Sequence, residues 1–343
     1  MDPLVSILVP AYNGEAFLAD TLRSALGQTW PRKEIIVVDD GSRDGTLAVA
    51  RQFESPTVKV VTQPNQGSAA TRNRCYALSQ GDFIQWLDAD DLLHPDKVRL
   101  QVEAAREGGT ARTLYSAGWS YFIHRPATAR FVPGPLWESL DPVEWLVRKM
   151  NHNAHMQTGT WLVSRALSEA TGAWDATLAT DDDGEYFARM FLHCDGVRFV
   201  PGSRVYYRVH PNARVSYIGR NQRKMESQLE SMERHIRYLR SLEDSPRTRA
   251  ACVNYLRNWQ LTFYPERPDL VERARKLAES LGGTLPPPVL PAKYAVIQKL
   301  FGWSAAKLTQ VYYNQVKSSL VCGWDRLLWR LQGAPRVPEV WSA

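Results

Sequence analysis

The sequence predicts an α/β fold in which a mostly parallel sheet is flanked by helices and followed by a helical C-terminal region. Apolar runs alternate with segments of helical periodicity through the first ninety residues, which is typical of βαβ units. The run at 34–39 is branched and almost continuously apolar, as expected for a strand buried on both faces. From about residue 219, charged residues interleave with Leu, Met and Tyr. We therefore expect an α/β domain at 1–218 and a helical region at 219–343.

The individual elements follow from composition and spacing. Strands are expected at 5–9, 34–39, 58–61, 83–87, 114–123, 161–163 and 205–209. Helices are expected at 17–26, 46–53, 68–78, 97–106 and 185–192. Gly41, Asp44 and Gly45 mark the turn before the helix at 46–53. A proline-rich break at 282–291 precedes one or two amphipathic helices within 294–331.

Composition limits the class of protein without deciding its function. The 343 residues carry a formal net charge of +6, which fits an anionic ligand, nucleic acid or an anionic membrane surface. Nucleic acid is not an expected partner, because no RNP or helix-turn-helix signature is present. The four widely spaced cysteines form no C-x-x-C pair, and no signal peptide or apolar run of membrane-spanning length is visible. A cytoplasmic location is expected, with a peripheral contact at the inner face of the membrane left open.

The most informative segment is an acidic cluster directly after the predicted strand at 83–87. Asp88, Asp90 and Asp91 lie within four residues, where the ligand sites of open α/β sheets are found. Clustered carboxylates repel one another unless a cation lies between them. Hard oxygen ligands favour Mg²⁺ or Mn²⁺, which commonly bridge to phosphates. The alternative is an acidic turn before a helix N-terminus.

Two further polar segments follow the first two predicted strands, so all three should meet at one sheet edge. Tyr12 could stack on a base, and Asp39 or Asp40 could accept hydrogen bonds from base or ribose. Arg72 and Asn73 could reach the base or a phosphate. Each segment could also be only a turn, a helix cap or a solvated helix face. No G-x-G-x-x-G follows the first strand, which argues against a dinucleotide-dependent dehydrogenase.

Taken in order, the segments at 9–13, 38–46, 65–73 and 87–91 resemble those of the family 2 glycosyltransferases with a GT-A fold. The resemblance covers roughly residues 4–215. It implies a nucleotide-sugar donor, a DxD-type metal site for Mn²⁺ or Mg²⁺, and inversion at the anomeric carbon. By this resemblance Asp90 is the direct metal ligand and Asp88 a ribose or metal-shell contact. The residues assigned to the nucleotide-sugar site are Pro10, Tyr12, Asn13, Asp39, Asp40, Gly67, Arg72, Asp88 and Ala89.

The catalytic base is expected in the acidic segment at 180–185. Together with 172–178 it resembles the second half of the family, where an acidic pair begins a helix. Asp183 is the preferred general base and Asp182 the second choice, because an inverting transferase needs one base on the acceptor hydroxyl. Three consecutive aspartates, beginning with Asp181, leave the register open by one. The alternative is a helix cap with acids in its first turn.

The segment at 206–210 resembles the closing motif of the family. It would place Arg208 near phosphate oxygens and His210 near the diphosphate or the metal, although a surface turn at His210 is the alternative. His152 and His155 have no third metal ligand nearby in sequence and indicate an acceptor-side loop. Trp161 or Trp137 could offer a sugar-stacking face there.

The function expected from these features is metal-dependent, inverting transfer of a sugar from a nucleotide-diphosphate donor to a glycan, lipid-linked or other hydroxyl acceptor. UDP-sugar is the expected donor, with GDP- and dTDP-sugars left open. The alternative is a non-catalytic nucleotide-sugar or glycan-binding protein on the same fold. Residues 294–331 mix aromatic, apolar and basic residues and could contact a membrane surface, pack on the domain or form a dimer contact. The oligomeric state is not predicted.

Overall fold

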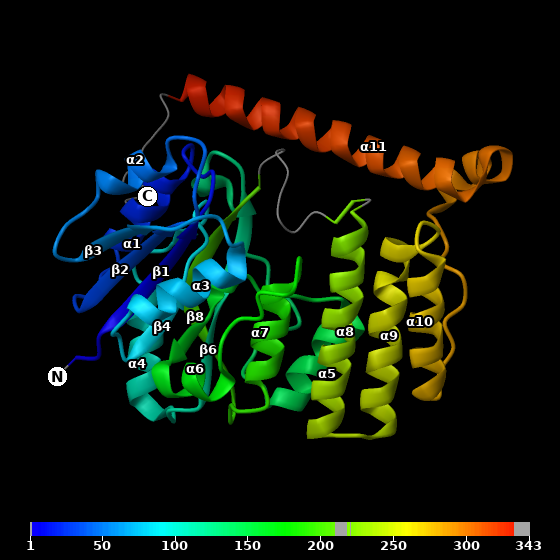
Figure 1. Cartoon of the computed structure of the whole chain (residues 1–343), viewed down its shortest axis with the longest axis horizontal. Helices are drawn as coiled ribbons and strands as arrows, with labels where there is room; N and C mark the ends of the chain where they lie inside the picture. Colours follow the sequence, from blue (N-terminus) through cyan, green and yellow to red (C-terminus); the bar gives the residue numbers. More distant parts are fainter. Residues whose placement is uncertain (1, 210–217, 220, 333–343) are drawn as a thin grey trace.

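The architecture is a mixed sheet of eight strands between two layers of helices, extended on one side by further helices (Figure 1). The structure is a computed structural model and describes residues 2–209, 218–219 and 221–332. The strand order is β3-β2-β1-β4-β7-β6-β8-β5. The strands are β1 (Val5–Ala11), β2 (Lys33–Asp39), β3 (Val58–Thr62), β4 (Phe83–Trp86), β5 (Leu92–Leu93), β6 (Thr113–Phe122), β7 (Leu162–Ser164) and β8 (Gly196–Arg208).

Eleven α-helices are found in the described part of the chain. They are α1 (Leu18–Leu26), α2 (Thr46–Arg51), α3 (Ser68–Leu78), α4 (Lys97–Gly108), α5 (Pro142–His152), α6 (Arg165–Thr171), α7 (Asp182–Met190), α8 (Gln222–Leu242), α9 (Pro246–Phe263), α10 (Pro268–Ser280) and α11 (Ala295–Leu331). Short 3₁₀ turns occur at η1 (Pro126–Thr128), η2 (Thr158–Thr160) and η3 (Ala292–Tyr294). The helices α5 and α6 and the strand β5 were not predicted from the sequence.

The first half of the sheet is parallel, as predicted. β1 pairs in parallel with both β2 and β4, and β2 pairs in parallel with β3. Alternate residues of these strands enter two different cores: Leu8 and Ile36 lie on one face, and Ile7 and Ile35 on the other. Burial on both faces explains the continuous apolar runs, because each side chain meets a helix layer.

The second half of the sheet departs from a parallel arrangement. β7 runs antiparallel between β4 and β6, and β5 runs antiparallel to β8. Strand direction is not visible in an apolar run of three residues such as β7. β7 is antiparallel to both β4 and β6, so β4 and β6 run in the same direction. β8 is parallel to β6, and β1 and β2 are parallel to β4. The C-terminal ends of β1, β2, β4, β6 and β8 therefore lie at one edge of the sheet. The candidate site lies at this edge.

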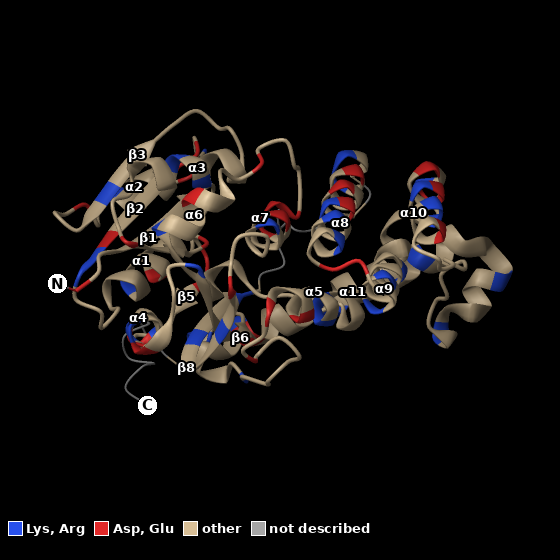
Figure 2. Ribbon diagram, turned by 90° about the horizontal axis from the view of Figure 1, so that it is seen from below, with Lys and Arg blue, Asp and Glu red and all other residues tan. Residues whose placement is uncertain are grey.

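The C-terminal helices differ in how they are held. α8, α9 and α10 contribute to the same hydrophobic core as α5 and α7, so they extend the α/β layer sideways. Their exposed faces carry closely mixed Lys, Arg, Asp and Glu, as α8 and α10 show in Figure 2. α9 begins with a capping box between Ser245 and Thr248. α11, in contrast, runs across one side of the molecule and is broken at Gly302, whose φ is 81° (Figure 1).

None of the described helices combines the length and the apolar character needed to cross a membrane.

Candidate functional site

The site begins where β1, β2 and β4 end. Tyr12 follows β1 directly and is 46% exposed, so its ring is available at the sheet edge. Pro10 occupies the penultimate position of β1, paired with Val38. Asp39 is the last residue of β2, and Asp88 follows β4 by two residues. The structure therefore brings these predicted residues to the same edge.

One carboxylate oxygen of Asp39 accepts hydrogen bonds from the protein, and the other accepts none. Its Oδ2 accepts from Thr62 Oγ1 at 3.0 Å and from the Ser42 backbone N–H at 3.4 Å. Its Oδ1 is buried and has no hydrogen-bond partner. A buried acceptor without a partner is unfavourable by about 1–3 kcal/mol. Asp39 Oδ1 is thus well suited to accept from an N–H or O–H group of a bound ligand.

Asp40 holds a loop and does not face the site with a free carboxylate. Its Oδ1 accepts from Gln63 Nε2 and from the Gln66 backbone N–H, both at 2.9 Å. Its Oδ2 accepts from the Gly67 backbone N–H at 2.9 Å. The predicted nucleotide contact of Asp40 is therefore corrected to a positioning role, in which Asp40 fixes the loop leading into α3. Gly67 itself adopts φ 89° at this loop–helix junction, a conformation that favours glycine.

Asn13 and Ala89 also hold loops together. The Asn13 side-chain oxygen accepts from the Arg43 backbone N–H at 2.8 Å, and its own N–H donates to Ser42 Oγ at 3.0 Å. The Ala89 carbonyl accepts from Thr21 Oγ1 at 3.0 Å. Asn13 thus joins the loops after β1 and β2, and Ala89 joins the segment after β4 to α1. Asn13 is exposed, so its assignment as a nucleotide-sugar contact stays a prediction.

Arg72 is the central connection of the site. It lies on α3, is 7% exposed, and donates from Nη2 to Asp88 Oδ1 at 2.9 Å and from Nη1 to Asp182 Oδ2 at 2.8 Å. Its guanidinium lies 4.5 Å from the centre of the Trp174 ring. This arrangement joins the acids after β4 to the acids at the start of α7, and it fixes the guanidinium between them.

The acidic cluster after β4 divides into a buried and an accessible part. Asp91 is fully buried, and its Oδ1 accepts from the Arg208 backbone N–H at 2.8 Å. Burial, followed by the nearby Asp90 and Asp88, raises the pKa of Asp91 well above its ordinary value. Burial also raises the pKa of Asp88, although Arg72 opposes this shift. Asp88 and Asp90 remain half-buried at the edge of the sheet, where a ligand can reach them.

Arg208 supports this acidic segment from behind. Its Nε donates to the Asp90 carbonyl at 2.8 Å, and Nη1 donates to the Ile123 carbonyl at 3.2 Å. Its guanidinium packs over the rings of Phe122 and Phe17 and is 4% exposed. The predicted phosphate contact of Arg208 is therefore corrected, because protein groups surround the guanidinium. His210, the predicted third metal residue, lies outside the described residues.

The three consecutive aspartates at the start of α7 face three different neighbours. Asp181 Oδ2 accepts from Ser231 Oγ on α8 at 2.7 Å. Asp182 Oδ2 accepts from Ser68 Oγ at 2.8 Å as well as from Arg72. Asp183 Oδ2 accepts from Thr158 Oγ1 at 3.2 Å. Asp181 thus attaches α7 to α8, Asp182 is ion-paired, and Asp183 makes no ion pair within the described residues.

The surroundings of Asp183 make its ionised form less favourable than that of an ordinary aspartate. Burial, followed by the charges of Asp182 and Asp181, raises the pKa of Asp183 to about 6, against the opposing influence of Arg72. A carboxylate with this pKa can accept a proton at pH 7 and release it again. Among the three aspartates, Asp183 is therefore the best suited to general-base chemistry.

The donor set at the edge suits a hard divalent cation that also binds a ligand. Within the described ranges, no three His, Cys, Asp or Glu side chains form a ready-made metal cage. Asp88 and Asp90 supply carboxylate oxygens, the ligand type that Mg²⁺ and Mn²⁺ prefer. Mg²⁺ in particular is commonly held by one or two carboxylates together with substrate phosphates. The two residues fit such an ion when a diphosphate completes its coordination.

Of the two aromatic residues predicted for the acceptor side, Trp161 is buried and Trp137 is partly buried. Trp161 is 1% exposed and stacks on Phe187, so the prediction of a sugar-stacking face on Trp161 is wrong. Trp137 is half-buried against Phe199. The structure instead gathers an aromatic cluster at the C-terminal ends of β6 and β8. Its members are Trp119, Tyr121, His155 and Tyr207.

Three other residues of the site were missed from the sequence. Ser68 and Trp174 hold Asp182 and Arg72, and Thr158 holds Asp183. Ser68 is the first residue of the helix predicted at 68–78, and Trp174 lies in the segment at 172–178 that resembles the family. The sequence therefore gave a weak signal for both residues. Nothing in the sequence around Thr158 marks it as a partner of Asp183. A surface hollow near Asp82 and Arg165 lies at the opposite edge of the sheet and is separate from this site.

The fold and the strand-end site together define a GT-A glycosyltransferase domain. The sequence model of glycosyl transferase family 2 matches residues 6–172. Residues 6–172 thus carry the sequence pattern of glycosyl transferase family 2, as the resemblance of the motifs predicted.

Relatives of this chain resemble it over limited regions. A putative teichuronic acid biosynthesis glycosyltransferase, TuaG of Bacillus subtilis, is 38% identical over 142 residues, which cover 38% of this chain and 56% of TuaG. Chondroitin synthase of Escherichia coli is 36% identical over 116 residues, which cover 33% of this chain and 17% of that enzyme. The matched region is thus under two thirds of either relative.

Among solved structures, S. aureus TarS 1–349 in complex with UDP has a TM-score of 0.59 at 17% identity, covering 91% of each chain. The same protein in complex with UDP-GlcNAc has a TM-score of 0.58 at 17% identity, covering 80% of this chain and 90% of TarS 1–349. At this identity the likeness shows the fold. It extends well beyond residue 172, into the helical region.

Proposed function

We propose that this chain is a metal-dependent, inverting glycosyltransferase that moves a sugar from a UDP-sugar to a hydroxyl group of a glycan or lipid-linked acceptor. The observation that carries the proposal is the double contact of Arg72 with Asp88 and Asp182. This contact joins two parts of the site. One is the acidic segment after β4, which is expected to face the donor diphosphate, and the other is the start of α7, where Asp183 lies.

The nucleoside end of the donor would lie against Tyr12 and Asp39. The exposed Tyr12 ring offers a stacking face, and the unpartnered Asp39 Oδ1 offers an acceptor for an N–H or O–H group. A uracil base has one ring N–H and no exocyclic amino group, so a single buried carboxylate oxygen is sufficient for it. The complexes of TarS with UDP and UDP-GlcNAc support a UDP-sugar as the donor.

Asp90 and Asp88 would hold Mg²⁺ or Mn²⁺ beside the diphosphate, Asp90 directly. When bound, the cation neutralises the negative charge that develops on the leaving diphosphate. The positions of Asp90 and Asp88 depend on residues further inside: Arg72 holds the Asp88 carboxylate, and Arg208 holds the Asp90 backbone. These arginines therefore act as positioning residues.

Asp183 would accept the proton of the acceptor hydroxyl as that oxygen forms a bond to the anomeric carbon. The bond between this carbon and the diphosphate oxygen breaks on the opposite face, so the configuration inverts. Thr158 orients the Asp183 carboxylate, and the neighbouring Asp182 and Asp181 charges raise its affinity for a proton. A fixed orientation and a raised affinity for a proton both suit a general base.

The test is release of nucleoside diphosphate from a panel of UDP-, GDP- and dTDP-sugars, with Mn²⁺ or Mg²⁺ and with EDTA, in wild type and Asp90→Ala. We expect slow hydrolysis of one UDP-sugar, lost in EDTA and in Asp90→Ala. The same panel is repeated with oligosaccharide acceptors, which should accelerate release. If no donor is turned over and calorimetry detects no metal-dependent nucleotide binding, the proposal fails and a glycan-binding role without catalysis takes its place.

A further inference from the structure

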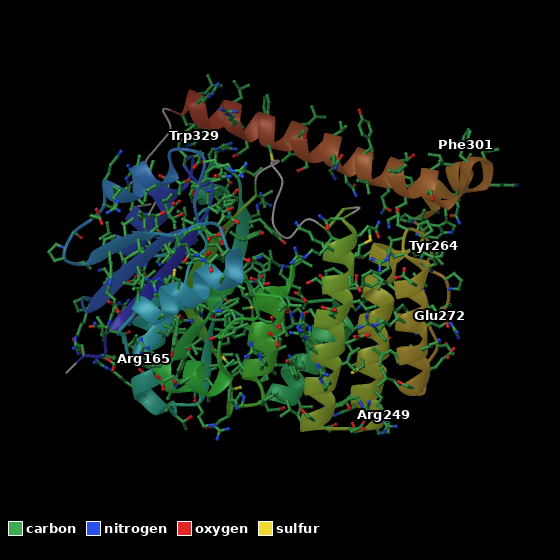
Figure 3. All side chains as sticks on the ribbon, viewed as in Figure 1. Arg165, Arg249, Tyr264, Glu272, Phe301 and Trp329 are labelled. Carbon is green, nitrogen blue, oxygen red and sulfur yellow. The ribbon has the colours of Figure 1, made fainter. Side chains whose placement is uncertain are left out.

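α11 is attached to the rest of the molecule mainly near its two ends. Near its start, Lys307 Nζ donates to the Tyr264 carbonyl at 2.7 Å and to Glu266 Oε2 at 2.6 Å. Near its end, Asp325 accepts from the His124 backbone N–H and from Arg125 Nε, each at 2.8 Å. Figure 3 shows Tyr264 below the start of α11 and Trp329 near its end.

The side of α11 that faces away from these attachments is apolar. Seven large side chains recur every three or four residues, so they form one continuous ridge along the helix. We call this the outer ridge. Its members are Leu308, Tyr312, Val316, Leu320, Trp324, Leu327 and Leu331, and each is between 41% and 74% exposed. At 100° per residue, the outer ridge around Leu320 and Trp324 points away from the attached Asp325 and the buried Cys322. A ridge of this length spans about 35 Å.

The charges of α11 are almost all positive. Residues 295–331 contain Lys299, Lys307, Lys317, Arg326 and Arg330, against the single acid Asp325. Asp325 is already paired with Arg125, so it does not neutralise an approaching surface. Lys317, Arg326 and Arg330 are exposed along α11, and Lys317 lies on the same side of the helix as Leu320 and Trp324. This combination of an apolar ridge, aromatic side chains and flanking basic residues is typical of helices that lie in a membrane interface.

We propose that α11 docks this chain on an anionic lipid bilayer through the outer ridge, lying in the plane of the membrane surface. Lys317, Arg326 and Arg330 complement anionic headgroups, whereas a second copy of the same helix would bring like charges together. The alternating charges of α8 and α10 provide no comparable surface, because acids and bases are interleaved there (Figure 2).

The attachment of α11 also orients the candidate site toward the bilayer. His124 and Arg125 follow the C-terminal end of β6, and the neighbouring Ile123 carbonyl accepts from Arg208, which in turn holds Asp90. α11 therefore lies at the same edge of the sheet as the candidate site (Figure 1). A chain docked through the outer ridge would meet an acceptor that is itself anchored in the membrane. This last step rests on the proposed function, whereas docking of α11 does not.

The test is cosedimentation of the full chain with vesicles of phosphatidylcholine alone or mixed with phosphatidylglycerol. We expect binding only to the mixed vesicles, weakened by high salt. The double variant Leu320→Glu/Trp324→Glu should bind at least about tenfold more weakly, because two apolar side chains no longer enter the interface. The triple variant Lys317→Glu/Arg326→Glu/Arg330→Glu should show a similar loss. Val289→Glu, which changes an equally apolar and 89% exposed residue outside α11, should bind like wild type.

Sedimentation velocity and thermal unfolding of the same variants complete the test. Unchanged melting temperatures would show that the variants are folded, as expected for exposed positions. Equal binding of wild type and the α11 variants to the mixed vesicles would overturn the proposal. The proposal would also be overturned if the wild type did not bind vesicles and formed a dimer that Leu320→Glu/Trp324→Glu converts to a monomer. The outer ridge would then join two copies of the chain. Donor hydrolysis in the absence of vesicles should be the same in wild type and in these variants. Its absence from the wild type would count against the proposed function and not against docking.

Discussion

Arg72 Nη1 donates to Asp182 Oδ2 over 2.8 Å and thereby joins α3 to the first turn of α7. Both side chains are under 10% exposed, so the pair is shielded from water. Because Arg72 also holds Asp88, the position of α7 is coupled to the acidic segment after β4. Asp183 follows Asp182 directly, so this ion pair places the proposed base relative to the proposed donor site.

Arg72→Met should destabilise the protein and abolish turnover. It leaves Asp182 buried without its cation, which is unfavourable by about 3 kcal/mol for a buried pair. We expect a clear fall in the free energy of unfolding, measured by urea denaturation, and loss of donor turnover. Arg51→Met, which removes an exposed arginine paired only with Glu54 on the surface, should change neither. A stable Arg72→Met protein with normal turnover would refute the role given to Arg72.

Asp183→Asn should separate catalysis from folding. Removing the general base should lower turnover by at least about a hundredfold while donor binding persists. The burial that raises the pKa of Asp183 also makes its charge unfavourable, so the variant should gain stability at pH 7, by up to about 3 kcal/mol. Turnover with acceptor, calorimetric donor binding and the melting temperature test these points together. Asp195→Asn, on the surface and paired with Arg112, serves as the control. A fully active Asp183→Asn would exclude this base.

Turnover should depend on pH through the same group. Asp183 must be ionised to accept a proton, and its pKa is raised to about 6, so kcat/KM should rise with pH and reach half its maximum near pH 6. The charged groups around it are Asp88, Arg72, Asp181 and Asp182.

Stability should change in the opposite direction over this range. The pKa of Asp183 is about 6 in the folded state and lies above its ordinary value of 3.8, so between these two values the folded state binds more protons than the unfolded state. The contribution of Asp183 to stability therefore falls as pH rises from about 4 to about 6. Comparing the pH profiles of wild type and Asp183→Asn isolates both effects. A rate profile that stays flat down to pH 5 would rule out a base with this pKa.

Asp90 and Asp91 should respond differently to the same substitution, although they are adjacent. Asp91 is fully buried and accepts from the Arg208 backbone N–H, a contact that an asparagine oxygen can also make. Asp91→Asn should therefore keep metal-dependent turnover. Asp90→Asn should lower it by about a hundredfold, because the metal loses its charged ligand. Titration with Mn²⁺ in each variant measures the difference. Equal losses in both variants would argue against Asp90 as the direct ligand.

The sequence made the first half of the fold predictable because each strand there is a long apolar run. β1, β2, β3 and β4 all appear close to their predicted limits, and so do α1 and α3. The second half was less visible. β7 is three residues long, and β8 begins at Gly196, well before the predicted start at 205. Short strands and a bulged pairing, such as that between β6 and β8, leave little periodic signal.

The site was predictable in its location but only partly in its contacts. Strand ends and acidic clusters indicated where Asp39, Asp88 and Asp183 would gather. Which side chains remain free for a ligand depends on tertiary hydrogen bonds that the sequence does not display. Asp39 keeps a free oxygen, whereas the adjacent Asp40 is fully used by the loop after β3. Arg208 looked like a phosphate contact because its position fits the motif, but its hydrogen-bond partners lie directly after β6 and in the acidic segment after β4.

The most direct test of the account is calorimetric titration of UDP, GDP and dTDP into the wild-type chain, with Mn²⁺ and with EDTA. We predict that UDP binds in the presence of Mn²⁺ and at least about tenfold more weakly in EDTA, because the carboxylates of Asp88 and Asp90 then face the diphosphate without a cation. Asp39→Asn should weaken the same binding, since an amide group would replace the unpartnered oxygen of Asp39. If none of the three nucleotides binds with Mn²⁺, the strand-end site does not bind a nucleotide-sugar and the account is wrong.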